Sequence, residues 1–223
     1  FMSLLIISII SYFLGSIPLA YLITKAFTGK DIRKVGSGNV GTLNTFRAIK
    51  EEKSIKLAII GFLLSLACDM GKAVLAIFIS QQFLGYNLQI GLILAAAFVV
   101  IGHNWPIFLK FRGGRGAACL MGVFLYLDPM ALIVWGVPIL IFSIIAELIL
   151  EKRVVFKISQ LFSAIGSQMV GRFIGIIVGL MLLYFYNVQI FQIAFLPIIL
   201  LLIQNIDRLK NYLQELKQKN TKG

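Results

Sequence analysis

The sequence predicts an all-α, polytopic membrane protein, and three observations support this fold class. Of its 223 residues, 59% are apolar and only 13% are charged, whereas about a quarter are charged in soluble domains. Apolar stretches long enough to cross a bilayer recur along the whole chain, and basic residues gather in alternate connections between them. Residues 1–223 are therefore expected to form a single integral membrane domain.

About seven helical spans are expected, because backbone in hydrocarbon must pair its own polar groups and these stretches lack the alternation of barrel strands. The first stretch has no cationic leader or A-x-A-like cleavage site, so we expect it to remain as a span. The fourth is short for a full crossing, which favours a tilted or re-entrant segment. The expected spans lie near residues 3–24, 55–80, 86–102, 117–127, 130–150, 158–186 and 188–203.

The charge distribution orients these spans. Lys and Arg crowd the connections 25–56, 110–115 and 152–157 and the segment after 203, while the other connections carry none. The positive-inside rule then places the N-terminus outside and the C-terminus in the cytoplasm. It also accounts for the net charge of +12, so no nucleic-acid partner is expected. Apolar residues on one face predict a short interfacial helix near 204–219.

Small residues indicate close helix packing and no metal chemistry. Gly171, Gly175 and Gly179 recur at four-residue spacing, which lets a neighbouring helix approach closely. Cys68 and Cys119 stand in apolar surroundings without metal-like spacing, so we expect both to be core residues. One histidine cannot assemble a metal cluster, and neither a metal nor a cofactor is expected.

Two loops on the expected cytoplasmic side carry residue types that suit a phosphate. The first is glycine-rich and is followed by Arg47, whose planar fork can bind two phosphate oxygens. The second ends directly before a span, where the helix dipole favours an anion. It lacks the Lys-Ser/Thr ending of a nucleotide-binding P-loop, so nucleotide hydrolysis is not indicated. The residues concerned are Gly36, Ser37, Gly38, Asn39, Asn44 and Arg47 in the first loop, and Gly113, Gly114, Arg115 and Gly116 in the second.

Several ionisable residues fall within or beside the apolar stretches. Asp69 and Lys72 lie three residues apart on one helical face, which predicts that they neutralise each other. Arg172 stands alone in its span and needs a partner that the sequence does not identify. His103 has no carboxylate at a suitable spacing, so it is either a structural donor or a site residue.

The two loops resemble the motifs of the PlsY family of acyl-phosphate:glycerol-3-phosphate acyltransferases. The resemblance rests on GSGNVGTLNTFR at 36–47 and GHNWPIFLKFRGGRGAA at 102–118. A third family motif resembles residues 205–209, Asn-Ile-Asp-Arg-Leu. Further matches are Gly15 to Pro18, Asp31 to Arg33, and Asp69 with Lys72. The chain departs from the family pattern at Leu43 (usually Thr), Arg115 (Lys), Leu202 (His) and Tyr212 (Gly).

The resemblance implies transfer of an acyl chain from acyl phosphate to the 1-hydroxyl of glycerol 3-phosphate, which makes lysophosphatidic acid. It implies a multi-pass enzyme of the inner (plasma) membrane with its site facing the cytoplasm, in contact with membrane lipids and supplied by an enzyme that makes acyl phosphate. Catalysis would be substrate-assisted, without a protein base. To the loop residues above, the implied substrate-binding set adds Lys72, His103, Asn205 and Arg208.

Two other functions remain open from the residues alone. An anion transporter or channel would also use basic loops and intramembrane charges, although no inverted repeat is visible. A non-catalytic, lipid-binding relative would keep the fold while Leu202 and Tyr212 replace working positions.

Overall fold

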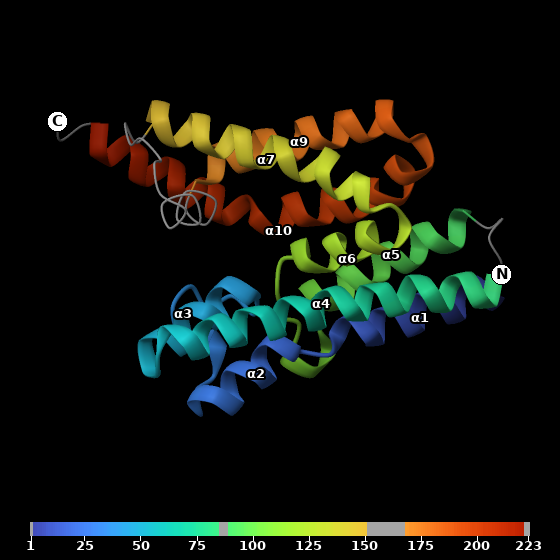
Figure 1. Cartoon of the computed structure of the whole chain (residues 1–223), viewed down its shortest axis with the longest axis horizontal. Coiled ribbons are helices and arrows are strands. Elements are labelled where there is room, and N and C mark those ends of the chain that lie inside the picture. The colour runs from blue at the N-terminus through green and yellow to red at the C-terminus, as the bar shows by residue number, and fades with distance from the viewer. Residues whose placement is uncertain (1, 85–88, 151–167, 221–223) are drawn as a thin grey trace.

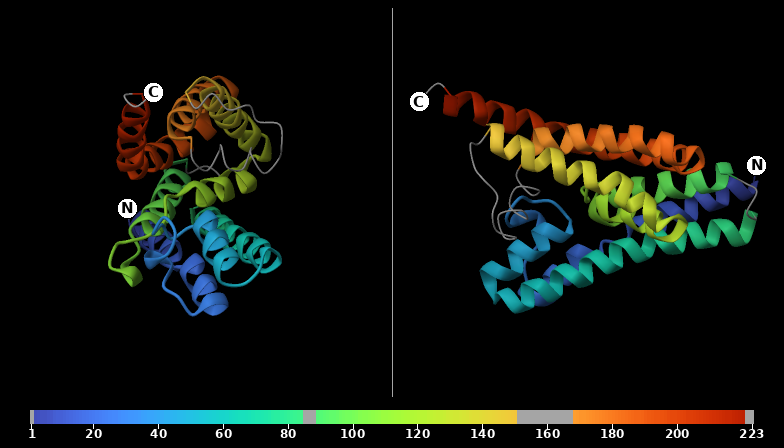
Figure 2. Two further views of the ribbon diagram at one scale, coloured as in Figure 1. Left: turned by 90° about the vertical axis from the view of Figure 1, so that its left-hand side faces the viewer. Right: turned by 45° about the horizontal axis from the view of Figure 1, so that its top comes forward.

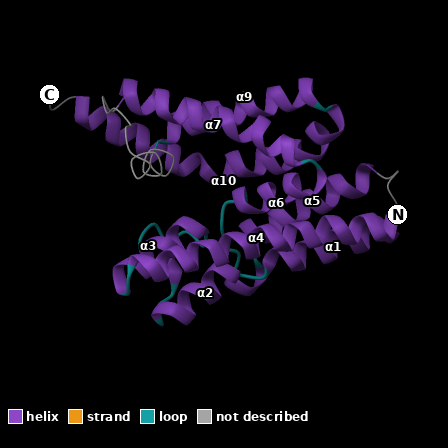
Figure 3. Ribbon diagram, in the orientation of Figure 1, coloured by secondary structure: helices purple, strands orange, loops and turns teal. Residues whose placement is uncertain are grey.

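The structure is a computed structural model that describes residues 2–84, 89–150 and 168–220. Figure 3 shows that these residues form helices joined by short loops, with no strand among them. Six helical stretches are long and apolar enough to cross a membrane, and a shorter apolar helix, α6, accompanies them. The predicted class of an all-α, multi-span membrane protein is therefore confirmed.

The helices follow the order of the apolar stretches. They are α1 (Met2–Ser16), α2 (Leu19–Thr28), α3 (Thr42–Glu52), α4 (Ile55–Leu84), α5 (Gln89–Asn104), α6 (Ala117–Leu127), α7 (Pro129–Leu150), α9 (Met169–Tyr186) and α10 (Val188–Asn220). Two single 3₁₀ turns, η1 (Ile32–Lys34) and η2 (Ile107–Leu109), lie in the loops. The predicted span 117–127 matches α6, and of the predicted span 158–186 the structure describes only residues 168–186.

Two groups of helices make up the bundle, and α6 lies between them (Figure 1). Cys119 and Val123 of α6 pack into a core formed mainly with α1, α4 and α5, to which α10 adds Ile193. Leu120 and Phe124 pack into a second core formed with α7, α9 and α10. Because both faces of α6 are covered, this helix of 11 residues joins the two groups. Cys119 is a core residue as expected, whereas Cys68 is only partly buried, so that prediction was wrong for Cys68. Many of the large apolar side chains on the outer faces are exposed, as lipid contact requires.

The first predicted span corresponds to one candidate membrane crossing, Met2–Thr28, but this crossing consists of two helices rather than one. α1 ends at Ser16 and α2 begins at Leu19, with Pro18 between them. Proline has no amide hydrogen to donate, so the helix cannot continue through it unbroken. Lys72 of α4 donates a hydrogen bond of 3.2 Å to the carbonyl of Ile17, which also accepts from the backbone N–H of Leu19 at 3.0 Å. The break thus receives a polar partner inside the bundle.

The connections at 25–56 and beyond 203 also differ from the predicted pattern. Residues 42–52 form the helix α3, so Asn44 and Arg47 lie on a helix rather than in an open loop. α10 runs without a break to Asn220, so the predicted segment near 204–219 continues the last span and is not a separate helix. Its position at the membrane interface stays a prediction. Figure 2 shows α10 as one long rod along the bundle.

Two of the described segments that carry positive charge, α3 and the C-terminal part of α10, lie at the same end of the molecule. In Figure 1, α3 and the C-terminal part of α10 lie at the end opposite the N-terminus. The chain begins at one end and finishes at the other.

Three glycines hold α7 and α9 together, as their spacing predicts. A Cβ at Gly175 would lie 2.5 Å from the Cα of Ile139, and one at Gly179 would lie 2.8 Å from the carbonyl oxygen of Trp135. Gly171 meets the backbone at Phe142 in the same way. The contacts on α7 move from Phe142 back to Trp135 as those on α9 advance from Gly171 to Gly179, so the two helices are antiparallel. Their backbones approach closely only because these positions carry no side chain.

The Gly175→Ala substitution is expected to destabilise this pair. The added methyl group would force α7 and α9 apart and lower the free energy of unfolding by about 1–3 kcal/mol. The matched control is Gly136→Ala on α7, where an added Cβ meets nothing within 4 Å. Unfolding of the purified variants by titration with a denaturing detergent measures the difference. Equal stability of the two variants would contradict the packing.

Candidate functional site

Asn44 shapes the first glycine-rich loop from inside the bundle. Its side-chain oxygen accepts a hydrogen bond from the backbone N–H of Ser37 at 2.9 Å. Its amide group donates to the carbonyls of Ile32 at 3.1 Å and Val35 at 3.0 Å. Gly36 and Gly38 have positive φ angles of 54° and 68°, which residues with a side chain rarely adopt. Asn44 is buried and fully engaged, so it organises the loop, while Ser37 stays exposed.

The second loop folds back on the end of α5. The backbone N–H groups of Gly113 and Gly114 donate to the carbonyls of Asn104 at 3.1 Å and His103 at 2.9 Å. A Cβ at Gly114 would collide with Nε2 of His103 and lie 2.7 Å from the carbonyl oxygen of Val40. The two loops therefore pack against each other at Gly114. Gly116, with a φ of 85°, is the N-cap residue directly before α6.

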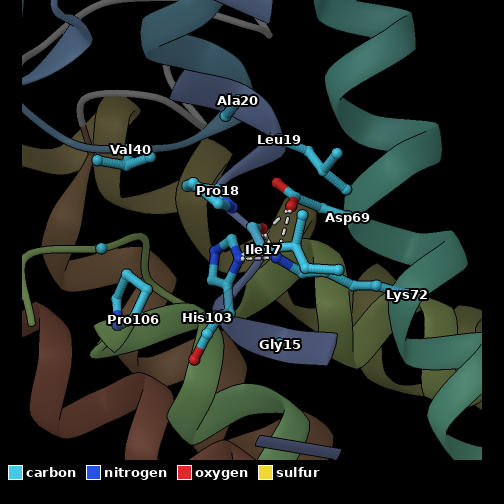
Figure 4. Close-up of a pocket in the computed structure, with 12 residues that line it drawn as sticks. Gly15, Ile17, Pro18, Leu19, Ala20, Val40, Asp69, Lys72, His103 and Pro106 are labelled. Atoms are coloured by element: carbon cyan, nitrogen blue, oxygen red, sulfur yellow. Dashed lines mark hydrogen bonds and ion pairs between the residues drawn. The ribbon is translucent and has the colours of Figure 1, made fainter. Parts of the chain in front are cut away.

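Asp69, Lys72 and His103 form one buried network, drawn in Figure 4. The ammonium of Lys72 lies 2.9 Å from Oδ1 of Asp69 and 2.9 Å from Nδ1 of His103, and Oδ1 also lies 3.5 Å from Nδ1. The predicted pairing of Asp69 with Lys72 is confirmed. His103 does have a carboxylate neighbour, which sequence spacing missed because Asp69 belongs to another helix. The network lines a small pocket beside Pro18, Val40 and Gly113.

The second loop also docks onto α10. Arg115 donates from Nη1 to the side-chain oxygen of Asn205 at 2.9 Å, and Gln204 donates to the carbonyl of Gly114 at 3.3 Å. The Asn205 side chain is itself held by a bond of 2.7 Å to the carbonyl of Leu201. Burial, with the guanidinium groups of Arg208 and Arg172 nearby, lowers the pKa of Arg115 to about 10. The third motif, residues 205–209, is thus in direct contact with the second loop through Asn205 and Arg115.

Four guanidinium groups gather where these segments meet, and we call Arg47, Arg115, Arg172 and Arg208 the arginine cluster. Arg172 and Arg208 both lie within electrostatic range of Arg47 and of Arg115. They come from α3, the second loop, α9 and α10. None of the ion pairs formed between described residues involves Arg47, Arg115 or Arg172. Such a concentration of positive charge suits an anion.

Two other basic residues near the first loop form ion pairs with carboxylates. Lys30 pairs with Glu52 at 2.5 Å, and Arg33 pairs with Asp31 at 2.6 Å. Hydrogen bonds from Arg33 hold the pKa of the Asp31 carboxyl at about 2. These pairs fasten the loop, and Arg33 also reaches the carbonyl of Leu109 at 3.5 Å. The positive charge of the arginine cluster is therefore distinct from these paired cations.

The sequence identified most members of this site but not their arrangement. Among the residues it predicted, the structure brings Arg47, Arg115, Asn205 and Arg208 together. It places Lys72 and His103 in the buried network instead. Gln204 was missed, because a glutamine beside a basic motif carries no distinctive signal. The sequence marked Arg172 as an intramembrane charge that needs a partner, but gave no reason to include it among the substrate-binding residues.

Comparisons with other proteins agree on one family. A family model described as glycerol-3-phosphate acyltransferase matches residues 5–212. Glycerol-3-phosphate acyltransferase 1 of Dehalococcoides mccartyi is 42% identical over 58% of this chain and 56% of its own length. The glycerol-3-phosphate acyltransferase of Pelagibacter ubique is 34% identical over 94% of this chain and 95% of its own length.

A solved structure has the same fold. It is the crystal structure of PlsY, an integral membrane glycerol 3-phosphate acyltransferase, in its glycerol 3-phosphate form. Its TM-score is 0.70 at 22% sequence identity, and the match covers 96% of this chain and 94% of that one.

The fold and the arginine cluster define a multi-span integral membrane protein with a strongly cationic site at one end of its helical bundle. The chain belongs to the glycerol-3-phosphate acyltransferase family, so the resemblance to PlsY is confirmed. It spans 56% of the length of the Dehalococcoides relative and 66% of the length of a second relative, from Moorella thermoacetica.

Proposed function

We propose that this protein transfers an acyl chain from acyl phosphate to the 1-hydroxyl of glycerol 3-phosphate. The products are lysophosphatidic acid and inorganic phosphate. Family membership supports the acceptor and the reaction class. The observation that carries the proposal is the convergence of the arginine cluster with the first loop, because both proposed reactants carry a phosphate group.

The arginine cluster would hold the two phosphates side by side. Arg172 and Arg208 both lie within electrostatic range of Arg47 and of Arg115, so the four guanidinium groups act on one region. Two anionic reactants repel each other, and guanidinium groups between them offset that repulsion. Holding the hydroxyl next to the acyl carbon turns a bimolecular reaction into an effectively unimolecular one. Ser37 and Asn39 add neutral donors in the first loop, where the backbone N–H of Gly38 is already engaged with the carbonyl of Val35 at 3.0 Å.

The chemical step needs no protein base. The hydroxyl oxygen attacks the acyl carbon, a new C–O bond forms, and the bond from that carbon to the phosphate oxygen breaks. Phosphate is a good leaving group, and one of its oxygens takes the proton of the attacking hydroxyl. The buried network of Asp69, Lys72 and His103 then has a positioning role, since it holds the second loop and the break at Pro18.

The setting of this reaction follows from the charge of the connections. The basic end of the bundle would face the cytoplasm, at the inner (plasma) membrane, where both phosphorylated substrates are water-accessible. The acyl tail would lie among the helices in contact with membrane lipids. An enzyme that produces acyl phosphate must act before this one.

Separate assays with three acyl donors test the proposal. The purified protein receives glycerol 3-phosphate with acyl phosphate, acyl-CoA or acyl carrier protein, and lysophosphatidic acid is measured. Only acyl phosphate is expected to support turnover. Transfer from acyl-CoA alone would refute the donor assignment. Anion flux in proteoliposomes without transfer would favour a transporter, and tight lipid binding without turnover would favour a non-catalytic relative.

A further inference from the structure

Arg172 is a charged residue on α9 whose guanidinium is incompletely paired. Its Nη2 atom is buried and has no hydrogen-bond partner among the described residues. A guanidinium inside a membrane span is costly unless acceptors surround it, so such residues face the bundle interior or a wet cavity. Arg172 therefore needs an acceptor.

None of the carboxylates in the described part of the chain forms an ion pair with Arg172. Glu147, at the end of the neighbouring helix α7, is buried but forms no ion pair with Arg172. The charged groups that act on Arg172 are Arg208 and Arg47, and both are positive. These like charges raise the free energy of the empty site, and an anion that enters it relieves the repulsion.

The position of Arg172 places it inside the cluster rather than at its edge. It follows Gly171, where α9 touches the backbone of α7, so its helix is fixed closely in place. From there it lies within electrostatic range of Arg47 on α3 and of Arg115 in the second loop. These two arginines belong to the first and second motifs, and the proposed function gives both phosphate groups to the arginine cluster. Arg172 thus shares one cationic site with an arginine of each motif.

We propose that Arg172 is a phosphate-binding residue of this site, contacting the phosphate of glycerol 3-phosphate or of the acyl donor. The proposal rests on the proposed function for the identity of the ligand. It adds a residue outside the three sequence motifs, and it gives the intramembrane charge of α9 a role in substrate binding. A purely structural arginine would instead stabilise the empty protein.

The Arg172→Gln variant tests the proposal by two measurements. The first is the KM for each substrate: the KM for the substrate it contacts is expected to rise about tenfold, as one charge-assisted hydrogen bond requires, with kcat less affected. The second is the thermal midpoint in detergent with and without inorganic phosphate. The phosphate-dependent increase should shrink. The midpoint without phosphate should not fall, because the substitution removes repulsion.

Lys56→Gln is the matched control, because Lys56 is an exposed basic residue at the start of α4 outside the cluster. It is expected to match the unsubstituted protein in both measurements. If Arg172→Gln does not fold, Arg172→Lys replaces it: the charge stays, the planar fork is lost, and the phosphate response should still fall. Unchanged KM values with an undiminished phosphate response would overturn the proposal. So would a lower midpoint without phosphate combined with an unchanged phosphate response.

The phosphate measurement separates this proposal from the proposed function. If the unsubstituted protein transfers no acyl group from any donor, the assigned reaction fails. The thermal response to inorganic phosphate still reports whether Arg172 binds a phosphate.

Discussion

Arg47→Ala is expected to lower acyl transfer by about 100-fold to 1000-fold, the usual effect of removing one donor to a developing charge in an active site. Arg47 lies exposed on α3 and takes part in none of the ion pairs formed between described residues. Its loss should therefore remove substrate binding without loosening the bundle. Initial rates with acyl phosphate and glycerol 3-phosphate measure the effect, and size-exclusion chromatography monitors the fold.

The control for Arg47 lies on the same helix. Lys50 is exposed about one turn further along α3, so Lys50→Ala removes one positive charge from the same surface without touching the cluster. This variant should keep nearly full activity. If both variants lose the same fraction of activity, the effect is one of general surface charge. An Arg47→Ala variant with full activity would remove this residue from the phosphate site.

Lys72→Met is expected to destabilise the protein by about 3–5 kcal/mol, the usual cost of leaving one partner of a buried ion pair alone. The ammonium of Lys72 forms an ion pair with Asp69, contacts Nδ1 of His103 and donates a hydrogen bond to the carbonyl of Ile17. The side chain of Lys72 is almost entirely buried. Its removal leaves the Asp69 carboxylate beside His103 alone and takes away one of the two donors to the carbonyl of Ile17, whose other donor is the backbone N–H of Leu19. Denaturing-detergent titration of the free energy of unfolding measures the loss.

The double variant Asp69→Asn with Lys72→Met separates a structural role from substrate binding. Removing both charges should restore a large part of the stability, because no unpaired charge remains in the bundle. If Lys72 instead binds a phosphate, Lys72→Met should lose activity while its stability stays unchanged. That result would contradict the positioning role of the network.

Helix spans could be predicted from the sequence because the membrane imposes one simple length requirement. Apolar stretches such as 55–80 and 130–150 had to be helical, since hydrocarbon offers no hydrogen-bond partners. Local exceptions depended on single residues. Pro18 interrupts the first stretch even though its hydropathy is continuous, and α3 is an amphipathic helix in a connection too polar to be read as a span.

The candidate site was harder to predict, because its members are distant in the chain. The motifs pointed to Arg47, Arg115 and Arg208, but nothing in the spacing fixes which helices lie side by side. Asn44 was expected to bind substrate, yet all its polar atoms hold the loop. The Asp69 neighbour of His103 likewise comes from another helix. Hydrogen-bond partners of this kind depend on tertiary packing, which periodicity does not encode.

The unbroken course of α10 couples two contacts that would otherwise be independent. Gln204 and Asn205 are adjacent on this helix, and their side chains bond the second loop at Gly114 and at Arg115. A rotation of this part of α10 would therefore strain both attachments at once, so the position of the second loop is tied to the orientation of the last helix.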